Sequence, residues 1–291
     1  MNWPKSLKIK RKFSLKKHTS MKVGGKAEFY LEPDNLSDLR SALRIANRNK
    51  LKVRILGAGS NLLISDKGVK GLTVRLNSPF FSRVEADNVF INAGSGSSLA
   101  KLIKISCNSG LSGLEFLSGI PASLGGALIM NAGCWGKEIS SLVCDLSVMD
   151  YDGNIENIKP SAADFSYRAS GLSKYIILKA KLKLRKENKK RIRELIKSYA
   201  VKKLETQDLT FPSAGCIFKN PKGKSAGRLI DECGFKGKRL GGALVSPKHA
   251  NFILNYHKAS ASDVLALMNT VKKEVRRKFG INLCPEVKIW R

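Results

Sequence analysis

The chain has 291 residues, of which 43% are hydrophobic, so it can bury a substantial core and form two or three domains. Its 53 basic residues against 23 acidic ones give a formal net charge of +30, which raises the question of a polyanionic partner. The basic residues are dispersed, and this favours a solvated basic surface over a nucleic-acid interface. No apolar run has the roughly 20 residues of a membrane helix, and the N-terminus lacks the apolar segment of a secretory signal.

Hydrophobic periodicity predicts alternating strands and helices in the first half of the chain. Strands are expected at 27–31, 53–56, 71–76 and 89–93, and helices at 35–49 and 98–109. The strand at 53–56 runs directly into Gly57, and Gly110 suits the C-terminal end of the second helix.

The second half begins with a strand at 142–151, which an Asp152-Gly153 hairpin turn follows. A strand at 175–185 carries basic residues on one exposed face, and a charged helix at 187–204 bridges two domains. A short helix is expected at 226–233. A longer one at 263–279 is capped near Ser262, ends at Gly280, and has an apolar stripe that predicts core packing (Val264, Leu267, Met268, Val271 and Val275).

The six cysteines are scattered and include no C-x-x-C pair. This pattern indicates reduced thiols of a cytoplasmic protein, without a disulfide framework or a metal site.

A first glycine-rich loop, 57–63, directly follows a predicted strand. Its small residues allow backbone N–H groups to bind an anion, and its polar side chains add donors. The loop lacks a dinucleotide fingerprint, because Leu62 replaces the third glycine and a strand follows it. Gly223-Lys224-Ser225 is not a P-loop, because Phe218 stands where the earlier glycine belongs.

A second glycine-rich stretch runs from 113 to 127 and continues to 131–134. Flexible backbone of this length costs folding entropy, and a close backbone approach to an extended ligand would justify that cost. Close helix packing around Gly125-Gly126 explains the glycines equally well.

The run from Pro212 to Pro221 places Cys216 in a glycine-containing turn, with Lys219 and Asn220 behind it. A lone thiol among small residues, followed by a cation and an amide, suits proton donation beside a bound anion.

Five motifs occur in order: His18-Thr19-Ser20 with Val23-Gly24-Gly25, the two loops, the Cys216 run, and Pro285-Glu286-Val287. Together they resemble the UDP-N-acetylenolpyruvoylglucosamine reductases (UDP-N-acetylmuramate dehydrogenases), flavoenzymes of bacterial cell-wall synthesis. The resemblance extends from about His18 to the C-terminus.

The resemblance implies an α+β protein with an FAD-binding domain of the vanillyl-alcohol-oxidase/PCMH type and a C-terminal α+β substrate-binding domain. The implied domain organisation is a basic N-terminal extension at 1–17, an FAD-binding domain at 18–187 with two α/β subdomains at about 18–76 and 77–187, a helical bridge at 188–202, and the C-terminal domain at 203–291. Only a short turn, 169–174, stands where one subgroup inserts a tyrosine-bearing loop, which places the chain in the loop-lacking type II subgroup.

The family binds FAD non-covalently and uses NADPH as co-substrate. The residues implied to contact FAD are Gly57, Ala58, Gly59, Ser60, Asn61 and Leu62 in the first loop, and Gly119, Ile120, Pro121, Ser123, Gly125, Gly126, Asn131, Ala132 and Gly133 in the second.

By the same resemblance Arg168 and Glu286 stabilise an enediolate of the enolpyruvyl substrate, and Cys216 donates the proton to C2. The best-known members carry serine at the position of Cys216. Implied substrate contacts are Tyr167, Lys219 and Asn220, whereas His249 is interpreted as a structural histidine.

Three alternatives remain. The first is another flavin oxidase or dehydrogenase of the same superfamily. The second is a basic nucleic-acid-binding protein. The third is a monomeric enzyme whose positive charge only steers anionic substrates toward it.

Overall fold

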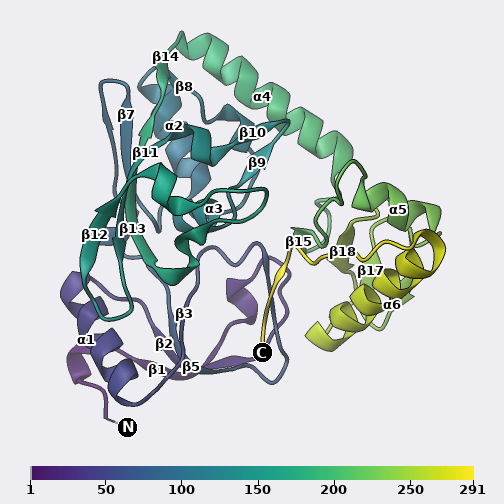
Figure 1. Ribbon diagram of the computed structural model, residues 1–291, viewed down its shortest axis with the longest axis horizontal. Helices are drawn as coiled ribbons and strands as arrows, with labels where there is room; N and C mark the ends of the chain where they lie inside the picture. Colours follow the sequence, from purple (N-terminus) through teal and green to yellow (C-terminus); the bar gives the residue numbers. More distant parts are fainter. Residues whose placement is uncertain (1) are drawn as a thin grey trace. The chain divides into compact units, whose positions relative to one another are not determined.

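The structure, a computed structural model, describes residues 2–291 and gathers them into two units, each built from separate segments of the chain (Figure 1). The first comprises residues up to Arg11 together with Phe29–Ala58 and Lys70–Lys203, and the second comprises Lys12–Glu28, Gly59–Val69 and Leu204–Arg291. Segments of the two units alternate along the chain. The predicted domains were continuous ranges of residues, and their boundaries stay a prediction.

A five-stranded antiparallel sheet organises the larger part of the first unit. Its strands, in spatial order, are β12 (Ile155–Ile158), β11 (Val143–Met149), β13 (Ile176–Lys183), β7 (Phe90–Gly94) and β6 (Val84–Asp87). Alternation along the second half of β13 buries Ala180 and Leu182 and exposes Lys179 and Lys183. The Lys181 ammonium lies 4.2 Å from the ring centroid of Phe90 on β7, so the basic face is partly packed on an aromatic ring.

Two helices pack against this sheet, α2 (Leu99–Asn108) and α3 (Leu124–Ile129). The Ser98 side chain caps α2 by accepting the Lys101 N–H, and Gly110 adopts a left-handed φ of +66° just after the helix ends. Leucines of both helices join sheet residues in one buried cluster that includes Leu102, Leu128, Ile91, Leu146 and Leu182. Two short antiparallel pairs flank it: β8 (Leu111–Ser112) with β14 (Arg185–Lys186), and β9 (Gly133–Cys134) with β10 (Lys137–Glu138).

A four-stranded sheet has the order β1 (Lys10–Ser14), β2 (Lys26–Leu31), β5 (Val69–Val74) and β3 (Val53–Ile55), with β3 parallel to β5. Helix α1 (Leu36–Arg48) follows β2 and is capped by Asn35, whose side chain accepts the Asp38 N–H at 3.0 Å. Leu39 and Leu43 of α1 are fully buried in a cluster with Phe29, Leu31 and Leu72.

Helix α4 (Lys189–Thr206) is the predicted charged helix, and most of its surface is exposed. Its two buried residues are Ile192 and Lys203. A lysine with only 4% exposure is unusual, and its ammonium donates to the Ser118 carbonyl at 3.1 Å.

The second unit contains an antiparallel sheet of β15 (Ser213–Cys216), β18 (Phe252–Asn255), β17 (Ala243–Val245) and β16 (Arg239–Leu240). Helices α5 (Ala226–Glu232) and α6 (Ala261–Phe279) belong to the same unit. A further parallel pair joins β19 (Lys288–Trp290) to β4 (Leu62–Ile64). The unit's core combines residues of the C-terminal segment with Met21, Val23 and Leu63, which explains why the N-terminal segments belong to it.

The apolar stripe predicted on α6 is confirmed as core, because all five of its residues are at most 2% exposed. Gly280 ends the helix in the left-handed conformation, as predicted. The predicted cap at Ser262 is wrong. Ser260 and Asp263 form a capping box, while the Ser262 N–H and hydroxyl both donate to the Asp66 carboxylate, at 2.9 and 2.8 Å.

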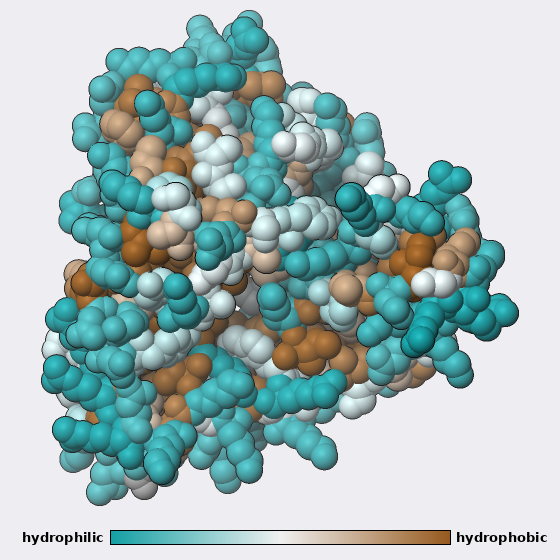
Figure 2. Space-filling model, viewed as in Figure 1, coloured by the Kyte–Doolittle hydropathy of each residue, from teal (hydrophilic) through white to brown (hydrophobic). Residues whose placement is uncertain are grey.

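The predicted strands correspond to β2, β3, β5, β7, β11 and β13, and the predicted helices to α1, α2, α4, α5 and α6, with ends shifted by a residue or two. Hydrophilic residues cover most of the face seen in Figure 2, in keeping with the charge of +30. Among residues 2–291, no helix has the length and apolar character needed to cross a membrane.

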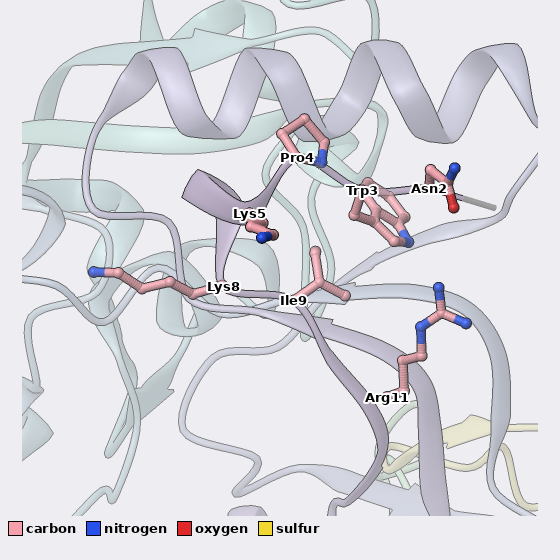
Figure 3. Close-up of a pocket in the computed structure, with 7 residues that line it drawn as sticks. All are labelled: Asn2, Trp3, Pro4, Lys5, Lys8, Ile9 and Arg11. Carbon is pink, nitrogen blue, oxygen red and sulfur yellow. The ribbon is translucent and has the colours of Figure 1, made fainter.

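The residues predicted as a basic N-terminal extension have regular structure. Strand β1 occupies one edge of the four-stranded sheet, and the flanking Leu7 and Leu15 are 3% and 0% exposed. The Trp3 ring lies 5.5 Å from that of Phe29, and Lys8 pairs with Asp34 at 2.9 Å. Figure 3 shows a shallow pocket lined by Asn2, Trp3, Pro4, Lys5, Lys8, Ile9 and Arg11. None of the predicted site residues lines this pocket.

We therefore expect Leu15→Ala to lower the free energy of unfolding by about 2–5 kcal/mol, because it removes a fully buried side chain and leaves a cavity. The matched control is Leu209→Ala, at a position 56% exposed, which should change stability by less than about 0.5 kcal/mol. Denaturant titration measures both. Equal, small effects would show that this segment is a dispensable extension.

Candidate active site

The first glycine-rich loop leaves its backbone N–H groups available. After β3 the chain runs from Gly57 to Asn61, and within residues 2–291 none of these five N–H groups donates a hydrogen bond to the protein. Strand β4 begins directly at Leu62, which agrees with the rejection of a dinucleotide fingerprint. Consecutive free N–H groups are the feature by which backbone binds phosphate oxygens.

Glycine is required at two positions of this loop. A Cβ at Gly59, whose φ is +69°, would lie 2.1 Å from the His18 carbonyl oxygen. A Cβ at Gly57 would lie 2.6 Å from the Ser123 hydroxyl oxygen. Any side chain at either position would displace its neighbours.

The carbonyl groups of the same loop are engaged. The Ser20 N–H donates to the Gly59 carbonyl at 3.1 Å, and the Lys288 N–H donates to the Asn61 carbonyl at 3.0 Å. The Asn61 side chain, expected to add a donor for an anion, donates to the Glu286 carbonyl at 3.1 Å. The carbonyls of Gly59, Ser60 and Asn61 are thus bonded to protein while the N–H groups are not, an arrangement that suits an anionic ligand.

The second glycine-rich stretch combines close packing at one end with unpaired polar groups at the other. Gly125 packs tightly, because a Cβ there would lie 3.1 Å from Cβ of Ser95, and its N–H donates to the Ser95 carbonyl at 2.8 Å. At the other end, the buried Ser118 hydroxyl has no hydrogen-bond partner within residues 2–291. Gly119, with a φ of +73°, donates no backbone hydrogen bond in the same part of the chain. Unpaired polar groups at 118–119 fit a cofactor that supplies their partners.

Asn131 uses its side chain to join three segments. It is fully buried with a φ of +42°, and its amide nitrogen donates to the Glu138 carboxylate at 2.7 Å and to the Ser166 carbonyl at 3.1 Å. Its amide oxygen accepts the Ser140 N–H at 3.2 Å. The Asn131 backbone N–H also donates to the Leu128 carbonyl, at 3.1 Å, so the predicted cofactor contact of Asn131 stays a prediction.

Arg168 lies in a tight turn beside this loop. Ser166 and Ala169 exchange backbone hydrogen bonds of 3.0 and 3.1 Å, and Arg168 between them has a φ of +54°. Its guanidinium donates to the Gly133 carbonyl at 2.8 Å and lies 5.2 Å from the ring centroid of Tyr167, which is 46% exposed. The first unit therefore brings Arg168 together with the end of the second loop, in a strained backbone conformation of the kind that functional sites retain.

Cys216 and Glu286 lie on neighbouring segments of the second unit. The predicted turn at Cys216 is instead the end of strand β15, which is distorted by a bulge where Gly215 has a φ of +73°. One residue further, the Ile217 carbonyl accepts the Glu286 N–H at 2.8 Å, and the Lys219 N–H donates to the Cys284 carbonyl at 2.9 Å. Both predicted catalytic side chains are partly exposed, so a ligand can reach them.

Asn251 was not identified from the sequence as a site residue. It is 3% exposed, and its amide oxygen accepts the Phe218 N–H at 3.0 Å while its amide nitrogen donates to the Phe218 carbonyl at 2.8 Å. Its backbone carbonyl also accepts the Ile217 N–H at 2.9 Å. These bonds continue the β15–β18 pairing past its last regular residue and hold the chain just after Cys216. A polar residue directly before the apolar run 252–254 was the available signal.

Of the predicted substrate contacts in this run, Asn220 is exposed and its amide oxygen accepts the Ala226 N–H at 3.0 Å, which fixes the approach to α5. Lys219 is partly exposed and directly follows Phe218. Its position is set by the backbone bond to Cys284.

His249 behaves as a structural histidine. Burial lowers the pKa of its imidazole, and Nδ1 accepts the Asn251 N–H at 3.2 Å, which requires that nitrogen to be unprotonated. The ring also packs 4.7 Å from that of Phe252.

Because the folded-state pKa of His249 lies below its unfolded value of about 6.5, the unfolded protein binds more protons. Stability contributed by neutral His249 is present above that pH and falls as the pH drops through and below it. As the pH drops from about 7.5 to about 5.5, we expect the free energy of unfolding to fall less in His249→Gln than in the wild type. His257→Gln, at an exposed histidine, is the control, and all proteins are compared at the same flavin content. Identical pH dependence in all three proteins would contradict this assignment.

Comparison with known proteins gives a consistent result along the whole chain. Residues 207–290 match the model of the UDP-N-acetylenolpyruvoylglucosamine reductase C-terminal domain, and residues 27–159 match that of an FAD-binding domain. The chain is 41% identical over 285 residues to UDP-N-acetylenolpyruvoylglucosamine reductase 2 of Symbiobacterium thermophilum, covering 97% of this chain and 92% of the relative. This chain belongs to the UDP-N-acetylenolpyruvoylglucosamine reductase family.

Solved structures agree. The reductase of Thermus caldophilus superimposes with a TM-score of 0.84 at 36% identity, covering 97% of this chain and 99% of that one. A variant of Phl p 4 described as a glucose oxidase aligns with a TM-score of 0.52 at 19% identity over 64% of this chain and 43% of its own, which shows a shared fold. The chain is therefore an FAD-dependent oxidoreductase, and the predicted vanillyl-alcohol-oxidase/PCMH-type domain with a C-terminal α+β domain is confirmed.

Proposed function

We propose that this family member reduces UDP-N-acetylglucosamine enolpyruvate to UDP-N-acetylmuramate with NADPH, a step of peptidoglycan synthesis. The observation that carries the proposal is the pairing of the Cys216 strand with the Glu286 segment, through the Glu286 N–H and the Ile217 carbonyl. This pairing holds a candidate proton donor and a carboxyl group on adjacent chain segments in a chain of this family.

The free N–H groups of Gly57–Asn61, together with Leu62, support the FAD pyrophosphate in this proposal. The second loop contributes Gly119–Pro121, Ser123, Gly125, Gly126 and 131–133 to the pyrophosphate and the flavin. The unpaired Ser118 hydroxyl and the Gly119 N–H support this placement. Held there, FAD would supply the chemistry of hydride transfer from NADPH to C3 of the enolpyruvyl group.

Hydride addition at C3 leaves negative charge at C2 that spreads into the adjacent carboxylate. A guanidinium is permanently charged and can bind that group in two-point fashion, and this is the role we assign to Arg168. One N–H of Arg168 already donates to the Gly133 carbonyl, which fixes the direction of its side chain. Glu286 polarises the same carboxylate, as a protonated group or through a water.

Cys216 supplies the proton that completes the reaction at C2. The S–H bond breaks, the C2–H bond forms, and the thiolate recovers its proton from solvent. A free thiol has a pKa of about 8.5, far below that of an aliphatic hydroxyl, so cysteine can replace the serine of better-known members. Tyr167, Lys219 and Asn220 are assigned as contacts of the sugar nucleotide.

The proposal is tested by following flavin absorbance anaerobically on the purified holoenzyme. NADPH should bleach the flavin, and UDP-N-acetylglucosamine enolpyruvate added afterwards should restore its absorbance. Reoxidation by oxygen alone would indicate a flavin oxidase of the same superfamily and overturn the proposed substrate.

Cys216→Ala should leave the NADPH half-reaction within about twofold of wild type, because no proton is delivered to the substrate in that step. Reoxidation by the enolpyruvyl substrate should slow by about 10²–10⁴-fold, the usual contribution of a general acid. Stopped-flow absorbance separates the two steps. Cys216→Ser should retain useful activity, and Cys144→Ala, at another partly exposed cysteine, is the matched control. A parallel loss of both half-reactions would exclude the proton-donor role.

A further inference from the structure

The Asn61 side chain joins the first glycine-rich loop to the segment that carries Glu286. Its amide nitrogen donates to the Glu286 carbonyl at 3.1 Å, and the next contact along the chain is the Lys288 N–H to the Asn61 carbonyl at 3.0 Å. Beyond these bonds, β4 and β19 pair in parallel register, with Lys288 opposite Leu62. Residues 286–288 thus run alongside the end of the loop and are hydrogen-bonded to it.

The Glu286 residue is held from two sides. Its N–H donates to the Ile217 carbonyl at 2.8 Å, next to Cys216, while its carbonyl accepts from Asn61. Movement of the loop at Asn61 would therefore be transmitted to the backbone from which the Glu286 side chain projects.

Ser20 makes a second link between the loop and the Cys216 strand. Its N–H donates to the Gly59 carbonyl at 3.1 Å, and its hydroxyl donates to the carbonyl of Ser213, the first residue of β15, at 2.6 Å. All of these residues belong to the second unit.

The side of the loop that would bind an anion is separate from these links. The backbone N–H groups of Gly59, Ser60 and Asn61 donate to no acceptor within residues 2–291. The Gly59 carbonyl accepts from Ser20, and the carbonyl and amide of Asn61 bond to residues 286–288. Asn61 therefore has one donor available to the cofactor and another committed to Glu286.

We propose that Asn61 is a positioning residue for Glu286, through which binding of the cofactor pyrophosphate to the loop orders the segment 284–288. The inference rests on the proposed function for the role of Glu286. In this proposal the Asn61 side chain contributes to the reaction with the enolpyruvyl substrate, and the Asn61 backbone N–H binds the cofactor.

The first test compares the two half-reactions of Asn61→Ala holoenzyme. Reduction by NADPH should stay within about twofold of wild type, whereas reoxidation by the enolpyruvyl substrate should slow about tenfold. The FAD dissociation constant, from fluorescence titration of apoprotein, should change less than about threefold. Asn47→Ala is the matched control, because Asn47 also donates from its amide to a distant carbonyl, that of Tyr151 at 2.9 Å. A large loss of FAD affinity would overturn the proposal.

A double-mutant cycle identifies the partner. If Asn61 acts through Glu286, Asn61→Ala in a Glu286→Gln background should change the reoxidation rate less than about twofold. Additive effects would mean that Asn61 acts elsewhere. Asn61→Asp, which keeps the size of the side chain but cannot donate to the Glu286 carbonyl, should reproduce the slow reoxidation and guards against misfolding of the alanine variant.

Hydrogen–deuterium exchange tests the coupling without substrate. Adding FAD to wild-type apoprotein should slow exchange in a peptide covering 284–290, and this protection should be lost in Asn61→Ala while peptides covering 99–108 behave alike in both proteins. The exchange experiment uses no substrate. A wrong substrate assignment would therefore leave its result unchanged, whereas a wrong role for Asn61 would alter it. Equal protection in both proteins would overturn the proposal.

Discussion

The structure depends on how the backbone from Gly57 to Asn61 divides its polar groups. The carbonyls of Gly59 and Asn61 accept hydrogen bonds from Ser20 and Lys288, and the N–H groups of the loop are left for a ligand. An unpaired N–H is costly when no partner is supplied, so this arrangement is stable only where water or an anion completes it. In the proposed function the FAD pyrophosphate is that anion, and the glycines at 57 and 59 permit the close approach of the loop to its neighbours.

A second constraint fixes the backbone at Cys216, the proposed proton donor. Strand β15 loses its regular pairing at the Gly215 bulge, directly before Cys216. The Asn251 amide and the Glu286 N–H then replace the missing ladder bonds at Phe218 and Ile217. Cys216 is therefore the last residue of β15 in register with β18, opposite Phe252, and the backbone directly after it is held on both sides. This combination gives a reactive group an accessible position and a fixed direction.

Local patterns predicted what depends on local physics. The α6 stripe, its Gly280 end and the strand running into Gly57 follow from periodicity and backbone sterics, and the structure has them. The helix cap was expected near Ser262, whereas Ser260 caps the helix in a local capping box with Asp263. Ser262 instead donates to Asp66, nearly 200 residues away in sequence, a contact that the local pattern does not encode. The bonds of Asn251 to Phe218 and of Arg168 to Gly133 join segments distant in sequence, and no local pattern encodes them. The order of the motifs identified the family, whereas the hydrogen bonds of single residues within the motifs required the fold.

Three asparagines show why a motif residue is not necessarily a ligand contact. Asn61, Asn131 and Asn251 each bond to backbone where the chain leaves regular structure, and two of them occur in the loops assigned to FAD. A carboxamide carries a donor and an acceptor at the spacing of a peptide group, so it can continue a ladder where the main chain cannot. In the two glycine-rich loops proposed to bind FAD, Asn61 and Asn131 fix the backbone through their side chains. The specificity of these motifs therefore lies as much in the scaffold that orients the N–H groups as in the groups that touch the ligand.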